Sequence, residues 1–197
     1  MHFSIKNEDY IYSSLSSKDN IKGIIHICHG KGEHIGRYSW LIGMLNSDGY
    51  HVISMDHRGH GRWIENNHEK GIFAKTNGWE VITEDLRNLI VYTNQKYPNL
   101  DQYLLAHSMG SWVGLNLIMN NTNIKGLIIS GSSKFPRSLI LAQKFLINIS
   151  IFFKGEYAIN PILNYMTDTT WNNKFKPNKT SFDWISSDPE NVKDYVN

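Results

Sequence analysis

The first two thirds of the chain alternate short apolar runs with longer segments in which apolar residues recur every three or four positions. The apolar runs have the length of β-strands and occupy 3–6, 10–15, 23–28, 50–55, 102–106 and 125–130. The periodic segments predict helices over 37–48, 79–97 and 109–120. We expect the first two strands to be antiparallel, whereas the later strands alternate with helices and indicate βαβ units. The predicted fold class is α/β, with a mostly parallel sheet covered by helices on both faces.

The alternation stops after Ser133. Residues 134–197 contain one apolar helical segment, then loops rich in Asn, Pro, Trp and Lys, and then a short acidic end without a predicted helix. The sequence therefore predicts two parts: 1–133, the N-terminal part of an α/β core, and 134–197, an insertion that covers the sheet edge. The apolar segment, 138–153, carries three polar residues and is shorter than the roughly 20 apolar residues of a membrane span. We expect it to form a buried or interfacial helix.

Composition narrows the class of protein only slightly. Hydrophobic residues make up 41% of the chain and charged residues 19%, which is ordinary for a soluble globular protein. The formal net charge of +2 is too small to indicate a nucleic-acid partner. Cys28 is the only cysteine, which excludes an intrachain disulfide, and the N-terminus has no signal-like apolar core. We therefore expect a cytoplasmic protein.

The strongest chemical signal is the segment Ala106-His107-Ser108-Met109-Gly110, between a predicted strand and a predicted helix. A small-x-Ser-x-Gly pattern in this place is typical of a nucleophile elbow, a tight turn that exposes the serine hydroxyl. The turn crowds the positions two before and two after the serine, and small residues occupy both. We expect Ser108 to be the nucleophile of a serine hydrolase and His107 to point away from it in a structural role.

A glycine-rich loop, His29-Gly30-Lys31-Gly32-Glu33-His34, follows the strand predicted over 23–28. Ester hydrolysis passes through an oxyanion, which two backbone N–H groups stabilise. We expect these donors to be the amides of Met109 and Lys31. The loop lacks the spacing of a phosphate-binding loop, and no helical spacing supports a metal site at His29 and His34. We expect neither a cofactor nor a metal.

A second polar loop, Asp56-His57-Arg58-Gly59-His60-Gly61-Arg62, follows the next strand. Two interpretations are open: a metal site at Asp56, His57 and His60, or a loop braced by hydrogen bonds and ion pairs that supports the elbow. We favour the second. The residues that we expect to support the site are His29, Gly30, Asp56, His57 and Gly110.

Taken in order, these motifs resemble the monoacylglycerol lipase and lysophospholipase branch of the α/β-hydrolases, the serine aminopeptidase-like hydrolases. The resemblance is carried by His-Gly-x-Gly-Glu-His at 29–34, Asp-His-Arg-Gly-His-Gly at 56–61, Gly-Trp at 78–79 and His-Ser-Met-Gly at 107–110. Residues 183–189 are similar to the cap (lid) of that branch, and Ala106 replaces its usual glycine. The resemblance implies a Ser-Asp-His hydrolase of lipid-type carboxylic esters, monoacylglycerol or lysophospholipid, that forms an acyl-enzyme on Ser108. It implies a partial helical cap at 134–197.

The resemblance also implies an aspartate and a histidine after the cap. All nine histidines lie at or before position 107, so we expect the triad Asp and His to be absent from this chain, the α/β-hydrolase fold to be truncated and the chain to be inactive alone. Two other hypotheses stay open: one half of a two-chain hydrolase, with a complementing chain that carries the missing strands, and a non-enzymatic acyl- or lipid-binding remnant. The helix near 139–153 either contacts a membrane surface or packs on the core.

Overall fold

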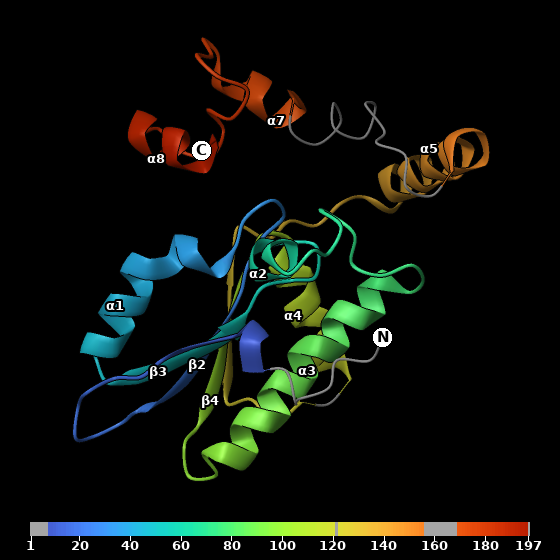
Figure 1. Cartoon of the computed structure of the whole chain (residues 1–197). Helices are drawn as coiled ribbons and strands as arrows, with labels where there is room; N and C mark the ends of the chain where they lie inside the picture. The colour runs from blue at the N-terminus through green and yellow to red at the C-terminus, as the bar shows by residue number, and fades with distance from the viewer. Residues whose placement is uncertain (1–7, 121, 156–168, 197) are drawn as a thin grey trace. The chain divides into compact units, whose positions relative to one another are not determined.

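The computed structural model describes residues 8–120, 122–155 and 169–196. By its internal contacts the chain divides into two units, Met1–Ser133 and Lys134–Asn197. The first unit is built on a five-stranded sheet in the order β1-β3-β2-β4-β5 (Figure 1). Its strands are β1 (Ile11–Ser14), β2 (Gly23–Cys28), β3 (Tyr50–Met55), β4 (Gln102–His107) and β5 (Gly126–Ser130).

The sheet confirms the predicted class. β1 is antiparallel to β3, and β3, β2, β4 and β5 run parallel to one another. The four predicted parallel strands lie within one residue of their expected bounds. The run at 3–6, which was expected to pair with the run at 10–15, lies outside the described residues; β1 pairs with β3.

The complete burial of β2 explains why the sheet has helices on both sides. Every residue of β2 is buried, so both faces of the strand need cover. Ile25 and Ile27 contribute to a cluster against helix α1 (Ser39–Ser47), which follows the short 3₁₀ helix η2 (Ile35–Tyr38).

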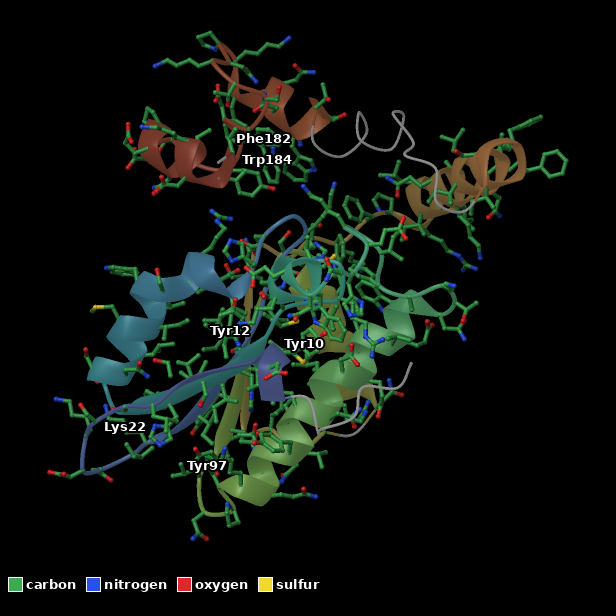
Figure 2. All side chains as sticks on the ribbon, viewed as in Figure 1. Tyr10, Tyr12, Lys22, Tyr97, Phe182 and Trp184 are labelled. Atoms are coloured by element: carbon green, nitrogen blue, oxygen red, sulfur yellow. The ribbon has the colours of Figure 1, made fainter. Side chains whose placement is uncertain are left out.

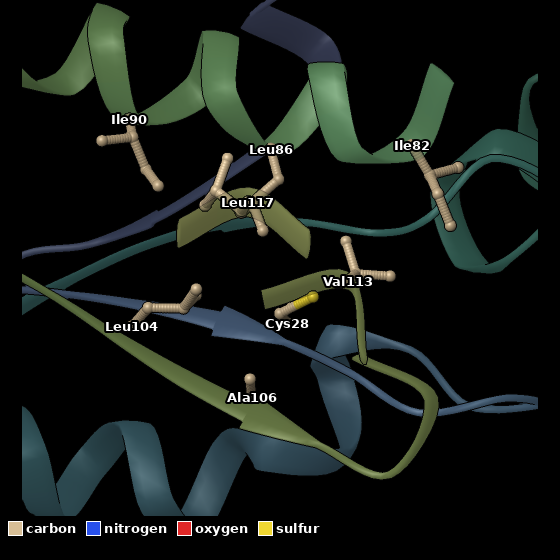
Figure 3. Close-up of a cluster of buried hydrophobic side chains, with 8 residues drawn as sticks. All are labelled: Cys28, Ile82, Leu86, Ile90, Leu104, Ala106, Val113 and Leu117. Atoms are coloured by element: carbon tan, nitrogen blue, oxygen red, sulfur yellow. The ribbon is translucent and has the colours of Figure 1, made fainter. Parts of the chain in front are cut away.

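The opposite face of the sheet carries helices α3 (Gly78–Lys96) and α4 (Met109–Met119). The side chains that pack between them and the sheet are Cys28, Ile82, Leu86, Ile90, Leu104, Ala106, Val113 and Leu117 (Figure 3). A Cβ atom built on Gly114 would lie 3.1 Å from Cβ of Ala106, so the glycine lets α4 approach the sheet closely.

Aromatic contacts fasten the N-terminal strand to the one-turn helix α2 (Gly61–Glu65), which the sequence pattern did not predict. The rings of Tyr10 and Trp63 stack with their centroids 4.0 Å apart, and the guanidinium of Arg62 lies 3.6 Å from the ring centroid of Tyr12. Tyr10 directly precedes β1 and Tyr12 belongs to it, near the start of the described residues (Figure 2). A single helical turn has too few positions to show a period, which explains why the sequence pattern missed it.

β5 is an edge strand of the described sheet and differs from its neighbours in exposure. Ile128 is 54% exposed and Ile129 is 41% exposed, although β2 is wholly buried. An exposed apolar edge of this kind is a surface on which a further strand can pair.

The second unit contains α5 (Arg137–Lys154), α7 (Thr170–Asn172), the 3₁₀ helix η4 (Asn173–Phe175) and α8 (Pro189–Val196). α5 confirms the predicted apolar helix, and α8 occupies the acidic end, for which the sequence pattern predicted no element. The carboxylate of Asp188 accepts a hydrogen bond from the amide of Glu190, and Pro189 is the first residue of α8. Asp-Pro is a helix start signal that was visible in the sequence. Within the described ranges, no helix combines the length and apolarity needed to cross a bilayer.

Candidate active site

The site lies beyond the ends of β2 and β4, from which the chain continues toward opposite edges of the sheet. β2 and β4 are parallel neighbours, with Cys28 opposite Ala106. The chain leaves β2 for β3 on one side and leaves β4 for β5 on the other. The loops after β2 and β4 therefore diverge at a topological switch point, the place where open α/β sheets commonly bind ligands.

Ser108 occupies the turn between β4 and α4. Its backbone has φ 50° and ψ −119°, a conformation that a non-glycine residue adopts only under constraint. Hydrogen bonds hold the residue from both sides: its N–H donates to the carbonyl of Ser130 (2.9 Å), and its carbonyl accepts from the N–H of Ser111 (2.9 Å). The turn has the strained geometry of a nucleophile elbow.

The neighbours of Ser108 leave no room for larger residues. A Cβ built on Gly110 would lie 2.1 Å from the carbonyl oxygen of Cys28 and 2.6 Å from that of His29. A Cβ built on Gly30 would lie 3.0 Å from Cβ of Ser108. The loop after β2 is therefore packed directly against the elbow.

We expect Gly110→Ala to lower the free energy of unfolding by about 3 kcal/mol, because both atoms that obstruct the new methyl group belong to the backbone. Gly43→Ala, within α1, is the matched control. No atom lies within 4 Å of a Cβ built there, so the higher helix propensity of alanine should stabilise the protein by up to about 1 kcal/mol. Urea denaturation of both variants measures the difference, and similar effects of the two substitutions would contradict this packing.

One carboxylate fixes the loop after β2. Glu33 is 7% exposed and accepts hydrogen bonds from the N–H of Gly30 (2.5 Å), the hydroxyl of Tyr38 (2.7 Å) and the guanidinium of Arg37 (2.7 Å). The N–H of Gly32 donates to Nε2 of His60 (3.2 Å). The two glycines on either side of Lys31 are thus both anchored. Glu33 belongs to the 29–34 motif, but the motif alone did not indicate this role.

His29 is a structural residue whose two ring nitrogens are both engaged. Nδ1 lies 2.8 Å from the carbonyl oxygen of Gly30, and Nε2 accepts from the N–H of His57 at 2.9 Å. The ring is fully buried, and burial lowers the pKa of His29 to about 3. His29 is therefore neutral at neutral pH, so the carboxylate of Asp56, 3.7 Å away, forms no ion pair with it. With both nitrogens used, this ring is not available as a metal ligand or a base.

Hydrogen bonds and a buried ion pair brace the loop after β3. The carboxylate of Asp56, 1% exposed, accepts from the amides of Ile35 (2.7 Å) and Arg62 (2.9 Å). Arg58 forms two hydrogen bonds, 2.6 and 2.9 Å, with the carboxylate of Asp85 on α3. Both side chains of this pair are less than one tenth exposed. The partner on α3 could not be inferred from the loop motif. In the described part of the chain, no group of three His, Cys, Asp or Glu side chains is arranged to hold a metal ion.

The histidine next to the nucleophile bonds elsewhere. Nδ1 of His107 lies 3.2 Å from the hydroxyl of Ser130. Among the described residues, no hydrogen bond joins Oγ of Ser108 to a histidine. The structure thus brings Ser108, Met109, Gly110 and the 29–34 loop together.

Known proteins share both the sequence and the fold. The sequence model of the family described as serine aminopeptidase, S33, matches residues 19–197. The chain belongs to this family. It is 33% identical over 150 residues to the monoglyceride lipase homolog of monkeypox virus, covering 73% of this chain and 52% of that protein. It is also 33% identical over 175 residues to human monoglyceride lipase, covering 85% and 52% of the two chains.

Among solved structures, a thermostable carboxyl esterase from Bacillus coagulans, in complex with glycerol, has a TM-score of 0.83 and 28% identity. The match covers 95% of this chain and 60% of the esterase. These likenesses confirm that the chain has the α/β-hydrolase fold and belongs to the monoacylglycerol lipase branch. The chain spans about half the length of the curated relatives that it matches.

Proposed function

We propose that this family member contributes Ser108 as the nucleophile of a carboxylic-ester hydrolase. The observation that carries the proposal is the strained elbow at Ser108, packed against the glycine loop after β2. In the reaction, Oγ bonds to the ester carbonyl carbon, the hydroxyl proton passes to a base, and the ester C–O bond breaks as the alcohol leaves. Water then attacks the acyl group and releases the acid and the serine.

The amides of Met109 and Lys31 are the proposed oxyanion-hole donors. Met109 is the first residue of α4, where the N–H groups and the helix dipole favour negative charge. Lys31 follows Gly30, which packs against the nucleophile, and the Glu33 carboxylate fixes this loop. Two donors aimed at one developing charge provide the electrostatic stabilisation that acyl transfer needs.

The proposed substrates are lipid-type esters, monoacylglycerols or lysophospholipids. The names of the relatives support this class: two are monoglyceride lipases or homologues, and Bacillus subtilis contributes a phospholipase. We also propose that α5 contacts a membrane surface peripherally. Phe145, Phe152 and Phe153 are 65%, 83% and 77% exposed, and α5 contains no acidic residue. Exposed aromatic residues beside basic ones are typical of interfacial helices.

The base is the part of the triad that this proposal places outside the 197 residues, whether in a longer chain or in a complementing one. No histidine follows position 107, and the buried residues His29, His57 and His60 each form a hydrogen bond to a backbone carbonyl through a ring nitrogen. Loss of the base lowers hydrolase turnover by about a million-fold. It also slows deacylation, because the same group activates water.

Without the base, we predict a single turnover, in which the serine is acylated once and is not regenerated. At about pH 9, hydroxide deprotonates a small fraction of the serine hydroxyls. p-Nitrophenyl butyrate should then slowly release one p-nitrophenolate per chain, and the steady rate that follows should equal the rate in buffer alone. Ser108→Ala should give no release above buffer. Sustained Ser108-dependent turnover would show that a base is present in the chain. The absence of any difference between the two proteins would favour a non-enzymatic binding role.

A further inference from the structure

A second serine forms a hydrogen bond with the backbone carbonyl of the nucleophile. Ser111 is fully buried in the first turn of α4, and its hydroxyl lies 2.5 Å from the carbonyl oxygen of Ser108 and 2.9 Å from the hydroxyl of Ser132. A hydroxyl has one proton to donate. Because the carbonyl can only accept, the proton of Ser111 belongs to that bond, and Ser132 donates to Ser111.

The carbonyl of Ser108 therefore accepts two hydrogen bonds from one residue, the N–H and the hydroxyl of Ser111. Helical serines often donate to a carbonyl three or four residues earlier. Here that carbonyl belongs to a residue with φ 50°, whose orientation the helix alone does not determine. The hydrogen bond from Ser111 thus restrains a peptide group whose backbone angles are not helical.

This peptide group also contains the proposed oxyanion donor. The carbonyl of Ser108 and the N–H of Met109 lie in one rigid plane and point in opposite directions, because the peptide bond between them is planar and trans. Any rotation of the carbonyl turns the N–H by the same angle. Hydrogen bonds that fix the carbonyl therefore fix the direction in which the N–H of Met109 points.

The end of β5 and the connection that follows it support the arrangement. The carbonyl of Ser130 accepts from the N–H of Ser108, the hydroxyl of Ser132 reaches Ser111, and the carbonyl of Ser133 accepts from the indole N–H of Trp112 at 3.1 Å. Three residues of one short segment thus bind the elbow, so Ser111 is held between the nucleophile and this connection.

We propose that Ser111, supported by Ser132, is a positioning residue that aims the Met109 amide at the oxyanion formed on Ser108. The inference rests on the proposed function and adds a residue to it. Ser111 should therefore stabilise the transition state and not the bound ester, since the negative charge that the amide stabilises is absent from the bound ester.

The test is the rate of Ser108 acylation by p-nitrophenyl butyrate, measured over a range of ester concentrations. Ser111→Ala should lower the limiting rate about tenfold, the factor that a hydrogen bond of ordinary net strength contributes, and should leave the half-saturating concentration unchanged. Ser111→Thr keeps the hydroxyl and should restore most of the rate. Ser132→Ala, at an exposed position, should lower the rate less, about threefold.

Ser133→Ala is the matched control, because this residue contacts the elbow through its carbonyl and not its hydroxyl. It should keep the wild-type rate. A purely structural role of Ser111 predicts a lower Tm with an unchanged acylation rate in folded protein, and that result would overturn the proposal. If Ser111→Ala does not fold, Ser132→Ala decides: a rate equal to that of Ser133→Ala would contradict the inference. Absence of acylation in the wild type would instead refute the proposed function.

Discussion

Lowering the pH from 7 to 5 should reduce the free energy of unfolding by about 2 kcal/mol through His29 alone. Burial lowers the pKa of this histidine to about 3 in the folded protein, whereas it is 6.5 in the unfolded chain. The unfolded state therefore binds more protons between these values. The contribution to stability is complete above pH 6.5 and is lost as the pH falls toward 3.

His57 and His60 add to this effect. Burial lowers the pKa of each, and their ring centroids lie 4.3 and 5.4 Å from that of His29. Each ring disfavours protonation of the others because like charges would meet in a buried space. The other titratable groups around the cluster are Cys28, Glu33, His34, Asp56 and Lys70.

Urea unfolding at pH 7, 6 and 5 measures the effect in the wild type and in His29→Gln. The wild type should lose stability steeply, and His29→Gln should show a slope smaller by up to about 1.4 kcal/mol per pH unit, the amount that corresponds to one proton. Equal slopes in the two proteins would contradict the assignment of the proton to His29.

Asp85→Asn should destabilise the first unit by about 3–5 kcal/mol. The substitution leaves the guanidinium of Arg58 buried without its counter-charge, although the shape of the side chain is nearly unchanged. The same variant should also loosen the loop after β3, because the pair joins that loop to α3.

Asp48→Asn is the matched control. Lys22 and Asp48 form an ion pair at 2.9 Å, but their side chains are 46% and 67% exposed. Water screens such a pair, so its loss should cost less than about 1 kcal/mol. Chemical denaturation of both variants separates the two cases. Similar losses would mean that the Arg58–Asp85 pair is hydrated in solution.

The fold was predictable where the pattern of apolar residues is long or both strand faces are buried. The 19 residues of α3 show the helical period clearly, and the mostly apolar run of β2 matches its complete burial. The pattern did not predict α2, which has five residues, or α8, whose start signal lies in an otherwise polar segment. Short elements depend on capping and tertiary contacts, which periodicity does not report.

The site was predictable where its requirements are local. The need for small residues beside Ser108 follows from the turn itself, and Gly110 meets it. The braces of the site were not predictable, because they join residues far apart in the sequence. Arg58 and Asp85 are 27 positions apart, and the hydroxyls of Ser111 and Ser132 are 21 apart. A single sequence carries no signal that pairs such residues before the fold is known.

The central claim is that Ser108 is a nucleophile, and the most direct test is to locate the acyl group. The chain is treated with p-nitrophenyl butyrate, its intact mass is measured, and the modified residue is mapped by proteolysis and tandem mass spectrometry. We predict a single butyryl group on Ser108, persistent because the proposed base lies outside the 197 residues, and none in Ser108→Ala. A butyryl group on lysine or histidine side chains with Ser108 unmodified would contradict it.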